Sequence, residues 1–362
     1  MTPHDPDKAE RGLTVPFRPF FLLTALDAPL AVGLWVPALL GWDVSNVIAD
    51  LPGWHGRALL FGTLPAMMAG FLRTALPRWT GRPLVGARLW PLLVPLWLAG
   101  RALSPWVASA HAPFLAALAL LVTAQIAAAR DRRNAVVAAL VGALAGAALC
   151  DAVPSALALS LGLVMVLGGR IAPSLTATHL GLPSKAGLFT ERPLFERVTA
   201  LMATCALVGW LVEPNSGTTA AASLLAALMQ AARMLQWRGW RTLDRPSVLA
   251  VHAAYACIPL GFAAVAASPG MVVHLWTVGA LGLMGFAVMS SMIRKHAGNA
   301  FGRSAVVTGC YALIGLAIAL RAVAAAAGED GPLWLLAAAG AWSAASFLFL
   351  AAFGRFLVRG LR

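Results

Sequence analysis

Long apolar runs, separated by short segments that carry charges, Pro or Gly, make up most of the chain. The runs are continuous and rich in Leu and Ala, and about 20 apolar residues are enough to cross the roughly 30 Å of a bilayer's hydrocarbon as a helix. Reading each run as one helix predicts twelve, near residues 19–41, 54–77, 88–108, 112–129, 134–150, 154–170, 197–213, 217–236, 247–267, 271–293, 304–326 and 333–354.

The composition agrees with a chain that is mostly surrounded by lipid. Hydrophobic residues make up 60% of the 362 residues and charged residues only 11%, against about 25% charged in a soluble domain. We therefore expect an all-α integral membrane protein of about twelve transmembrane helices, whose partner is the lipid bilayer. The predicted parts are a tail at 1–18, a membrane domain at 19–354 and a tail at 355–362. The longest connection, 171–196, divides the helices into two sets of six.

The net charge of +13 is a topology signal rather than a sign of nucleic-acid binding, because the basic residues form short groups between apolar runs. When the predicted loops are assigned alternately to two sides, all but three of the 27 Lys and Arg fall on the side of the N-terminus. The three exceptions are Arg57, Arg101 and Arg321. Basic residues resist translocation, so both termini are predicted to be cytoplasmic.

Four of the seven histidines lie in or beside predicted helices, where imidazole is costly unless it has a partner. His55 and His274 begin the second and tenth helices, and the alternating helix direction places both near the outer face. His252 and His296 lie near the inner ends of the ninth and tenth helices. His274 and His296 are about 33 Å apart if the chain between them is helical, so the histidines predict an outer pair and an inner pair.

The outer pair is a candidate haem site. Haem iron accepts axial imidazoles from facing helices, and haem propionates favour Arg and Trp donors near the membrane interface. His55 and His274 are the candidate iron ligands, and Trp54, Arg57 and Arg101 are the candidate donors. The alternative is that both histidines only cap their helices and bond to backbone or water.

The inner pair predicts a polar cluster of His252, His296 and Tyr255, which is a candidate second metal site. Two separate structural histidines are the alternative.

Two charged residues lie inside predicted spans, where ionisable side chains usually carry a function. Asp27 in the first helix is a candidate proton relay or ion-pair partner, and Arg321 in the eleventh helix either reaches outward or pairs with Asp27. These charges and the Gly- and Pro-interrupted helices also fit a cofactor-free solute transporter. A regulatory or assembly protein without catalysis is a third interpretation. No P-loop, H-E-x-x-H motif or Ser-His-Asp series is present.

Several segments resemble the NnrS family of bacterial membrane proteins over most of the chain. They are, in order, FRPFFLL, WHGRALLFG, AGFLRTALPRWTGRPLVG, WLAGR, GGRIAP, VHAAYACIPLG and HLWTVGALGLMGFAVM. The family is described as haem- and copper-containing and is associated with the nitric-oxide response. The resemblance therefore implies a location in the bacterial cytoplasmic (inner) membrane, a haem cofactor, and an electron donor or a diatomic gas as partner. It fixes neither a reaction, such as a haem-dependent oxidoreductase, nor an oligomeric state.

The family's motif histidines correspond to His55, His252, His274 and His296, but other motif positions differ. The family's second helix reads W-H-x-H-E-M, and here Arg57 and Ala58 replace its second His and its Glu. Ser291 stands where the family has Arg, and RKHAGN, from Arg294 to Asn299, replaces a later motif. One potential metal ligand is thus replaced at the outer face, and we expect haem without stoichiometric copper.

Overall fold

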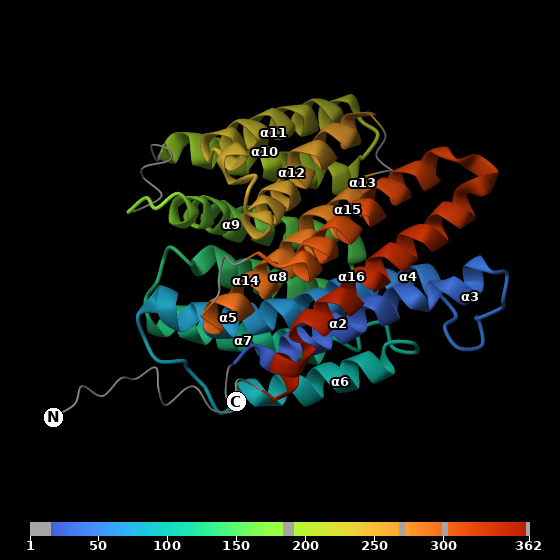
Figure 1. The fold of residues 1–362 in the computed structure, drawn as a ribbon, viewed down its shortest axis with the longest axis horizontal. Coiled ribbons are helices and arrows are strands. Elements are labelled where there is room, and N and C mark those ends of the chain that lie inside the picture. Colours follow the sequence, from blue (N-terminus) through green and yellow to red (C-terminus); the bar gives the residue numbers. More distant parts are fainter. Residues whose placement is uncertain (1–15, 184–191, 268–271, 299–302, 360–362) are drawn as a thin grey trace. The chain divides into compact units, whose positions relative to one another are not determined.

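The computed structural model describes residues 16–183, 192–267, 272–298 and 303–359, and within these ranges the chain forms helices and no strand (Figure 1). Each of the twelve predicted runs overlaps one helix or a series of two or three consecutive helical elements. The all-α fold class is therefore confirmed.

Contacts divide the chain into two compact units. Unit 1 comprises residues 1–153, 293–298 and 346–362, and unit 2 comprises residues 154–292 and 299–345. Two helices that begin in unit 2 end in unit 1, within 293–298 and 346–362.

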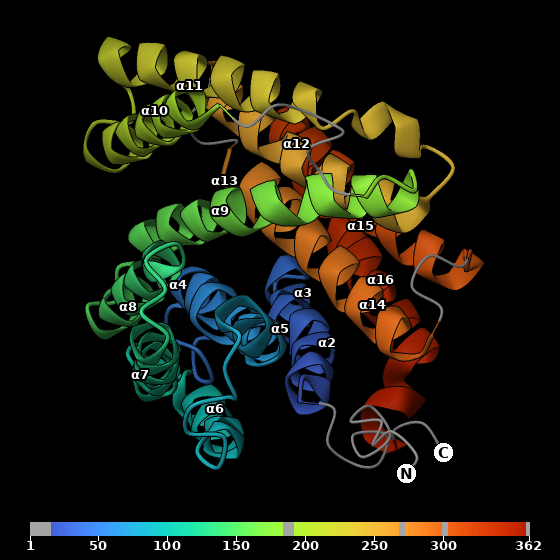
Figure 2. The ribbon, with the colours of Figure 1, turned by 90° about the vertical axis from the view of Figure 1, so that its left-hand side faces the viewer.

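In unit 1, α2 packs along α5 and α7 packs along α8 (Figure 2). The part of the unit up to residue 149 contains α2 (Arg18–Gly33), α3 (Trp35–Leu39), α4 (Leu51–Arg57), the π-helix η1 (Ala58–Thr63), α5 (Leu64–Thr80), the 3-10 helix η2 (Trp90–Leu92), α6 (Leu93–Leu103), α7 (Ala112–Ala128) and α8 (Ala135–Leu149). The helix α5 ends where Gly81 takes a φ of +64°, a left-handed value that suits glycine because it lacks a Cβ.

In unit 2, α11 packs against both α10 and α12, and α12 packs against the π-helix η5. The remaining elements are α9 (Val153–His179), α10 (Pro193–Val212), α11 (Gly217–Gln236), η4 (Gly239–Thr242), α12 (Pro246–Ala267), α13 (Val272–His274), η5 (Leu275–Leu283), α14 (Met284–His296), α15 (Ala305–Ala326), η6 (Gly328–Asp330) and α16 (Gly331–Arg359).

Eight helices in the described part of the chain are long and apolar enough to cross a membrane. They are Arg18–Leu39, Leu51–Thr80, Val153–His179, Pro193–Val212, Pro246–Ala267, Val272–His296, Ala305–Ala326 and Gly331–Arg359. Three shorter apolar helices, Trp90–Leu103, Ala112–Ala128 and Ala135–Leu149, also coincide with predicted spans. The count of twelve spans and the cytoplasmic position of both termini stay predictions.

The predicted connection 171–196 is shorter in the structure, because α9 continues to His179 and α10 begins at Pro193. The sequence predicted an end to the sixth helix near Gly168 and Gly169, with Pro173 beyond it. These glycines instead lie inside the helix, against side chains of other helices, and Pro173 lies in the helix interior. Tertiary packing thus overrides weak local helix propensity here. At the C-terminus, α16 likewise extends past the predicted end at 354 to Arg359.

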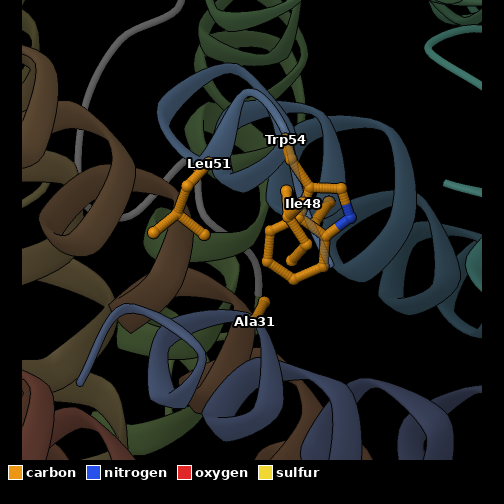
Figure 3. Close-up of a cluster of buried hydrophobic side chains, with 5 residues drawn as sticks. Ala31, Ile48, Leu51 and Trp54 are labelled. Carbon is orange, nitrogen blue, oxygen red and sulfur yellow. The ribbon is translucent and has the colours of Figure 1, made fainter. Parts of the chain in front are cut away.

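A small apolar cluster holds the connection between α3 and α4 against α2 (Figure 3). Its buried members are Ala31, Ile48, Leu51, Trp54 and Ala58, and Trp35 is among the partly buried residues that pack on it. The Asp50 side chain accepts a hydrogen bond from the Gly53 N–H at 3.0 Å and so caps α4. The cluster and the cap together fix the start of α4, which carries one of the predicted site histidines.

Candidate functional site

A hydrogen bond joins His55 to the backbone of α2. Its Nδ1 lies 3.0 Å from the carbonyl oxygen of Ala31, and the Trp35 ring meets the imidazole edge-on at 5.7 Å between centroids. A carbonyl oxygen only accepts, so Nδ1 carries the hydrogen and Nε2 carries the lone pair in the neutral ring. This is the arrangement by which a backbone carbonyl commonly orients a metal-ligating histidine.

Both predicted outer histidines lie at the start of a helix that turns π-helical. His55 precedes η1 by two residues, and His274 is directly followed by η5. A π-helical segment is rare and is frequently found at functional sites. The two histidines predicted to bind haem therefore share this local feature.

Arg57 is fixed by two carboxylates. Its Nη2 lies 3.2 Å from Asp50 and its Nη1 lies 3.2 Å from Asp151. Asp151 takes a φ of +51°, a left-handed value that is uncommon for a residue with a side chain. The Nε of Arg57 and the indole Nε1 of Trp35 are buried and have no hydrogen-bond partner among the described residues.

The other predicted propionate donors are engaged within unit 1. The indole Nε1 of Trp54 donates to the Ser104 hydroxyl at 3.0 Å, and the Arg101 guanidinium lies over the Trp54 ring at 4.7 Å. Arg101 also forms a short ion pair with the buried carboxylate of Asp27, which accepts a second bond from the Thr63 hydroxyl at 2.6 Å. The Arg partner of Asp27 is thus Arg101, because α2 and α6 bring these two charges together. A pair with Arg321 was one of two alternatives that the sequence left open.

In unit 2, Arg321 contacts His274 instead. Its Nη2 lies 2.8 Å from Nδ1 and 2.6 Å from Nε2 of the imidazole. A guanidinium only donates, so at least one nitrogen of His274 accepts a hydrogen bond from it. His55 is thus bound to a backbone acceptor in unit 1, and His274 is bound to a cation in unit 2.

Tyr255 is the centre of a buried polar network that the sequence only partly predicted. Its hydroxyl donates to the amide oxygen of Gln230 at 2.7 Å and accepts from Arg233 Nη1 at 2.6 Å. Arg233 also pairs with Glu196 at 2.7 Å and donates to the Met165 carbonyl at 3.0 Å. No spacing in the sequence joined Gln230 and Arg233 to Tyr255, but the Gly168 and Gly169 pair was a signal, because these glycines make room for Tyr255 and Arg233.

Of the three residues in the predicted inner cluster, Tyr255 and His252 contact the same tryptophan. The Tyr255 and His252 rings both pack on Trp237, at 4.6 and 6.4 Å between centroids. His252 Nε2 lies 2.7 Å from the Thr176 hydroxyl, which itself donates to the Ala172 carbonyl, so Nε2 carries the hydrogen. His296 belongs to unit 1, where its ring contacts Phe17 at 5.0 Å. A metal shared by His252 and His296 stays a prediction.

His111 lies outside the predicted helices, between 88–108 and 112–129, and is 1% exposed. It lies in the turn before α7, and its ring contacts that of Trp97 at 6.5 Å between centroids. Burial, with a smaller effect of the Arg101 charge, lowers the pKa of His111 to about 4, so the ring is neutral at neutral pH. No local pattern in the sequence indicated this position, because the contacts come from residues of α6 and η1 that only the packing of the helices brings to the ring.

Comparison with protein families decides the identity of the chain. A family model described as "NnrS protein" matches residues 12–360, nearly the whole chain. The chain belongs to the NnrS family. The resemblance predicted from the sequence motifs is thereby confirmed. Comparison with curated proteins gives no match.

Membership of the NnrS family agrees with the helical structure, whose long apolar helices are those of a multi-pass membrane protein. The NnrS match includes all four predicted motif histidines, His55, His252, His274 and His296. The protein is thus a membrane protein of NnrS type.

Proposed function

We propose that this NnrS-family protein binds haem in the bacterial inner membrane and serves the nitric-oxide response or membrane redox chemistry, with His55 as an axial ligand of the iron. The observation that carries the proposal is the hydrogen bond from His55 Nδ1 to the Ala31 carbonyl. It fixes the tautomer in which Nε2 has the lone pair that an iron ion requires.

The surroundings of His55 fit a cofactor that carries carboxylates. Trp35 Nε1 and Arg57 Nε are buried donors without a partner among the described residues. The Trp35 ring contacts the His55 ring, and Arg57 follows His55 by two residues in α4. A buried donor without an acceptor is costly, and a carboxylate is a strong acceptor for indole and guanidinium hydrogens. In this proposal Trp35 and Arg57 are donors to a propionate, while Trp54 and Arg101 keep the bonds that they make within unit 1.

His274 is the proposed second axial ligand, but its ring already accepts a hydrogen bond in the structure. Its present partner is Arg321, which donates to the ring and therefore competes with a metal for the same lone pair. Ligation by His274 requires Arg321 to give up this bond. The proposal for His274 rests on its motif position and on the π-helix that follows it.

The haem would supply a one-electron redox centre, and with two histidine ligands that centre favours electron transfer over gas binding. The residues of the chain would bind and position this group. The Ala31 carbonyl holds the His55 tautomer, the cluster around Trp54 excludes water from the start of α4, and Arg57 offers a fixed positive charge. If His55 were the only residue of the chain to bind the iron, the iron would be able to bind a diatomic gas.

Copper is not part of the proposal. Arg57 occupies the position of the family's second helix-2 histidine, and its guanidinium is held between Asp50 and Asp151. A guanidinium stays protonated and has no lone pair to offer a metal, so this replacement removes a ligand position. The chain is thus expected to bind haem without a stoichiometric copper ion.

The test is the absorption spectrum and metal content of the full-length protein, purified in detergent after expression with ample haem. We expect a Soret band in proportion to the protein, and iron well in excess of copper by elemental analysis. A protein without a Soret band would contradict the proposal and favour the cofactor-free transporter or the regulatory protein. Copper equimolar with protein would contradict the role assigned to Arg57.

A further inference from the structure

His111 is a buried imidazole whose hydrogen-bonding capacity is unused. Its side chain is among the most buried polar groups of the chain, with 1% of the residue exposed. Neither ring nitrogen has a hydrogen-bond partner among the described residues. Buried polar groups in folded proteins are nearly always bonded, to protein or to an ordered small molecule, so two unbonded nitrogens on one ring point to a ligand.

The ring lies between two backbones that approach it only because they belong to glycines. A Cβ on Gly62 would lie 3.1 Å from Nε2 and Cε1 of His111, and a Cβ on Gly100 would lie 2.9 Å from Nδ1. Trp97 closes the side of the ring and fixes η1 by donating to the Gly62 carbonyl at 2.9 Å. We call Gly62, Trp97, Gly100 and His111 the His111 socket. The socket leaves little room beside the ring.

A second unbonded donor belongs to the same helix as the socket. Nη2 of Arg101 is buried and has no hydrogen-bond partner among the described residues, although Nε and Nη1 are bonded. Gly100 and Arg101 follow Trp97 by three and four residues along α6, so all three lie on one face of the helix. Arg101 directly follows Gly100, whose backbone approaches Nδ1 of His111.

We propose that the His111 socket and Arg101 Nη2 bind a small uncharged hydrogen-bonding molecule of the size of water. The neutral ring offers one donor and one acceptor, and Arg101 offers one more donor, which suits a molecule that both donates and accepts. The closeness of Gly62 and Gly100 to the ring limits the ligand to a small one.

Charged ligands do not fit this position. Arg101 already has its counter-ion in Asp27, so an added anion would be buried without a matching charge. A metal ion would need several ligands, and no three His, Cys, Asp or Glu side chains gather in the part of the chain that the structure describes. None of the residues of this site is a proposed ligand of iron or a proposed donor to a propionate.

The direct test is nitrogen NMR of the full-length protein labelled with ¹⁵N-histidine in detergent micelles, with the His111 signals assigned by their loss in His111→Gln. We expect a neutral ring with both nitrogens shifted as in hydrogen-bonded imidazole, and a magnetisation-exchange or contact signal from water to the ring N–H. Nitrogen shifts of an unbonded ring would overturn the proposal. So would the shifts of a metal-bound imidazole.

Thermal unfolding of two matched variants gives an independent test. His111→Gln keeps a donor and an acceptor, whereas His111→Leu is of similar size and apolar. With a ligand in the socket, His111→Gln is expected to have the higher Tm, because glutamine can bond to the same molecule. The opposite order, with His111→Leu more stable, would show that the nitrogens gain nothing from a partner. Both measurements work on haem-free protein, so they fail or succeed separately from the proposed function.

Discussion

His55 donates the hydrogen on Nδ1 to the carbonyl oxygen of Ala31, 3.0 Å away. Ala31 belongs to α2 and is itself packed in the apolar cluster that fixes the start of α4 (Figure 3). The position of the imidazole and its tautomer are therefore set by the backbone of a neighbouring helix. The bond leaves the lone pair of the neutral ring on Nε2, which is the nitrogen that the proposed iron ligand would use.

Replacing Trp35 with Phe is expected to weaken haem retention while leaving the fold intact. The indole Nε1 is buried without a hydrogen-bond partner among the described residues, so its loss removes a proposed propionate donor and no existing bond. The measurement is haem loss to a haem-binding acceptor protein, followed by the Soret band. Trp54→Phe is the matched control, because its Nε1 bonds to Ser104 rather than to a cofactor. Equal retention by wild type and Trp35→Phe would remove Trp35 from the site.

Replacing Asp27 with Leu is expected to destabilise the protein by about 3–5 kcal/mol, because it leaves the Arg101 charge buried without its counter-ion. Replacing both residues, as Asp27→Leu with Arg101→Met, is expected to recover most of that loss. Thermal unfolding in detergent measures both, and Asp43→Asn is the control, since Asp43 is exposed. A single variant as stable as the double variant would show that the pair is not a structural unit.

The positions of the helices could be predicted from the sequence because each apolar run is long enough to be a helix, and Val153–His179 and Ala305–Ala326 illustrate this. The sequence did not show where α9 ends, because its continuation through Pro173 depends on packing. Motif positions gave His55 and His274. The partners of these residues, and the unbonded groups Trp35 and His111, depend on contacts between helices that no local pattern encodes.

Replacing Gly169 with Ala is expected to destabilise unit 2 by about 1–3 kcal/mol. The added Cβ would lie 2.5 Å from Nη2 of Arg233, so the guanidinium must move away from Tyr255 and Glu196. Gly142→Ala in α8 is the matched control, because nothing lies within 4 Å of its Cβ position, and it should be neutral or stabilising by up to about 1 kcal/mol. Equal Tm values for the two variants would contradict the close packing at Gly169.

The predicted topology places the loop between α3 and α4 outside the cell and the loop after α5 inside. A cysteine at Ser45 should therefore react with an impermeant thiol reagent in intact cells, whereas a cysteine at Ala87 should react only after lysis. The exposed native residues Cys150 and Cys205 are first replaced with Ser, so that they do not contribute labelling. The reverse pattern would overturn the predicted orientation of both termini.

The most direct test of the account is the Soret absorbance per protein of wild type, His55→Ala and His274→Ala, purified in parallel after expression with ample haem. His179→Ala is the matched control, because His179 pairs with Asp244 at the end of α9 and is not a proposed ligand. Wild type and His179→Ala are expected to show equal Soret bands. His55→Ala should lose the band, and His274→Ala should lose or shift it. Full, unshifted bands in both His55→Ala and His274→Ala would contradict the proposed haem site.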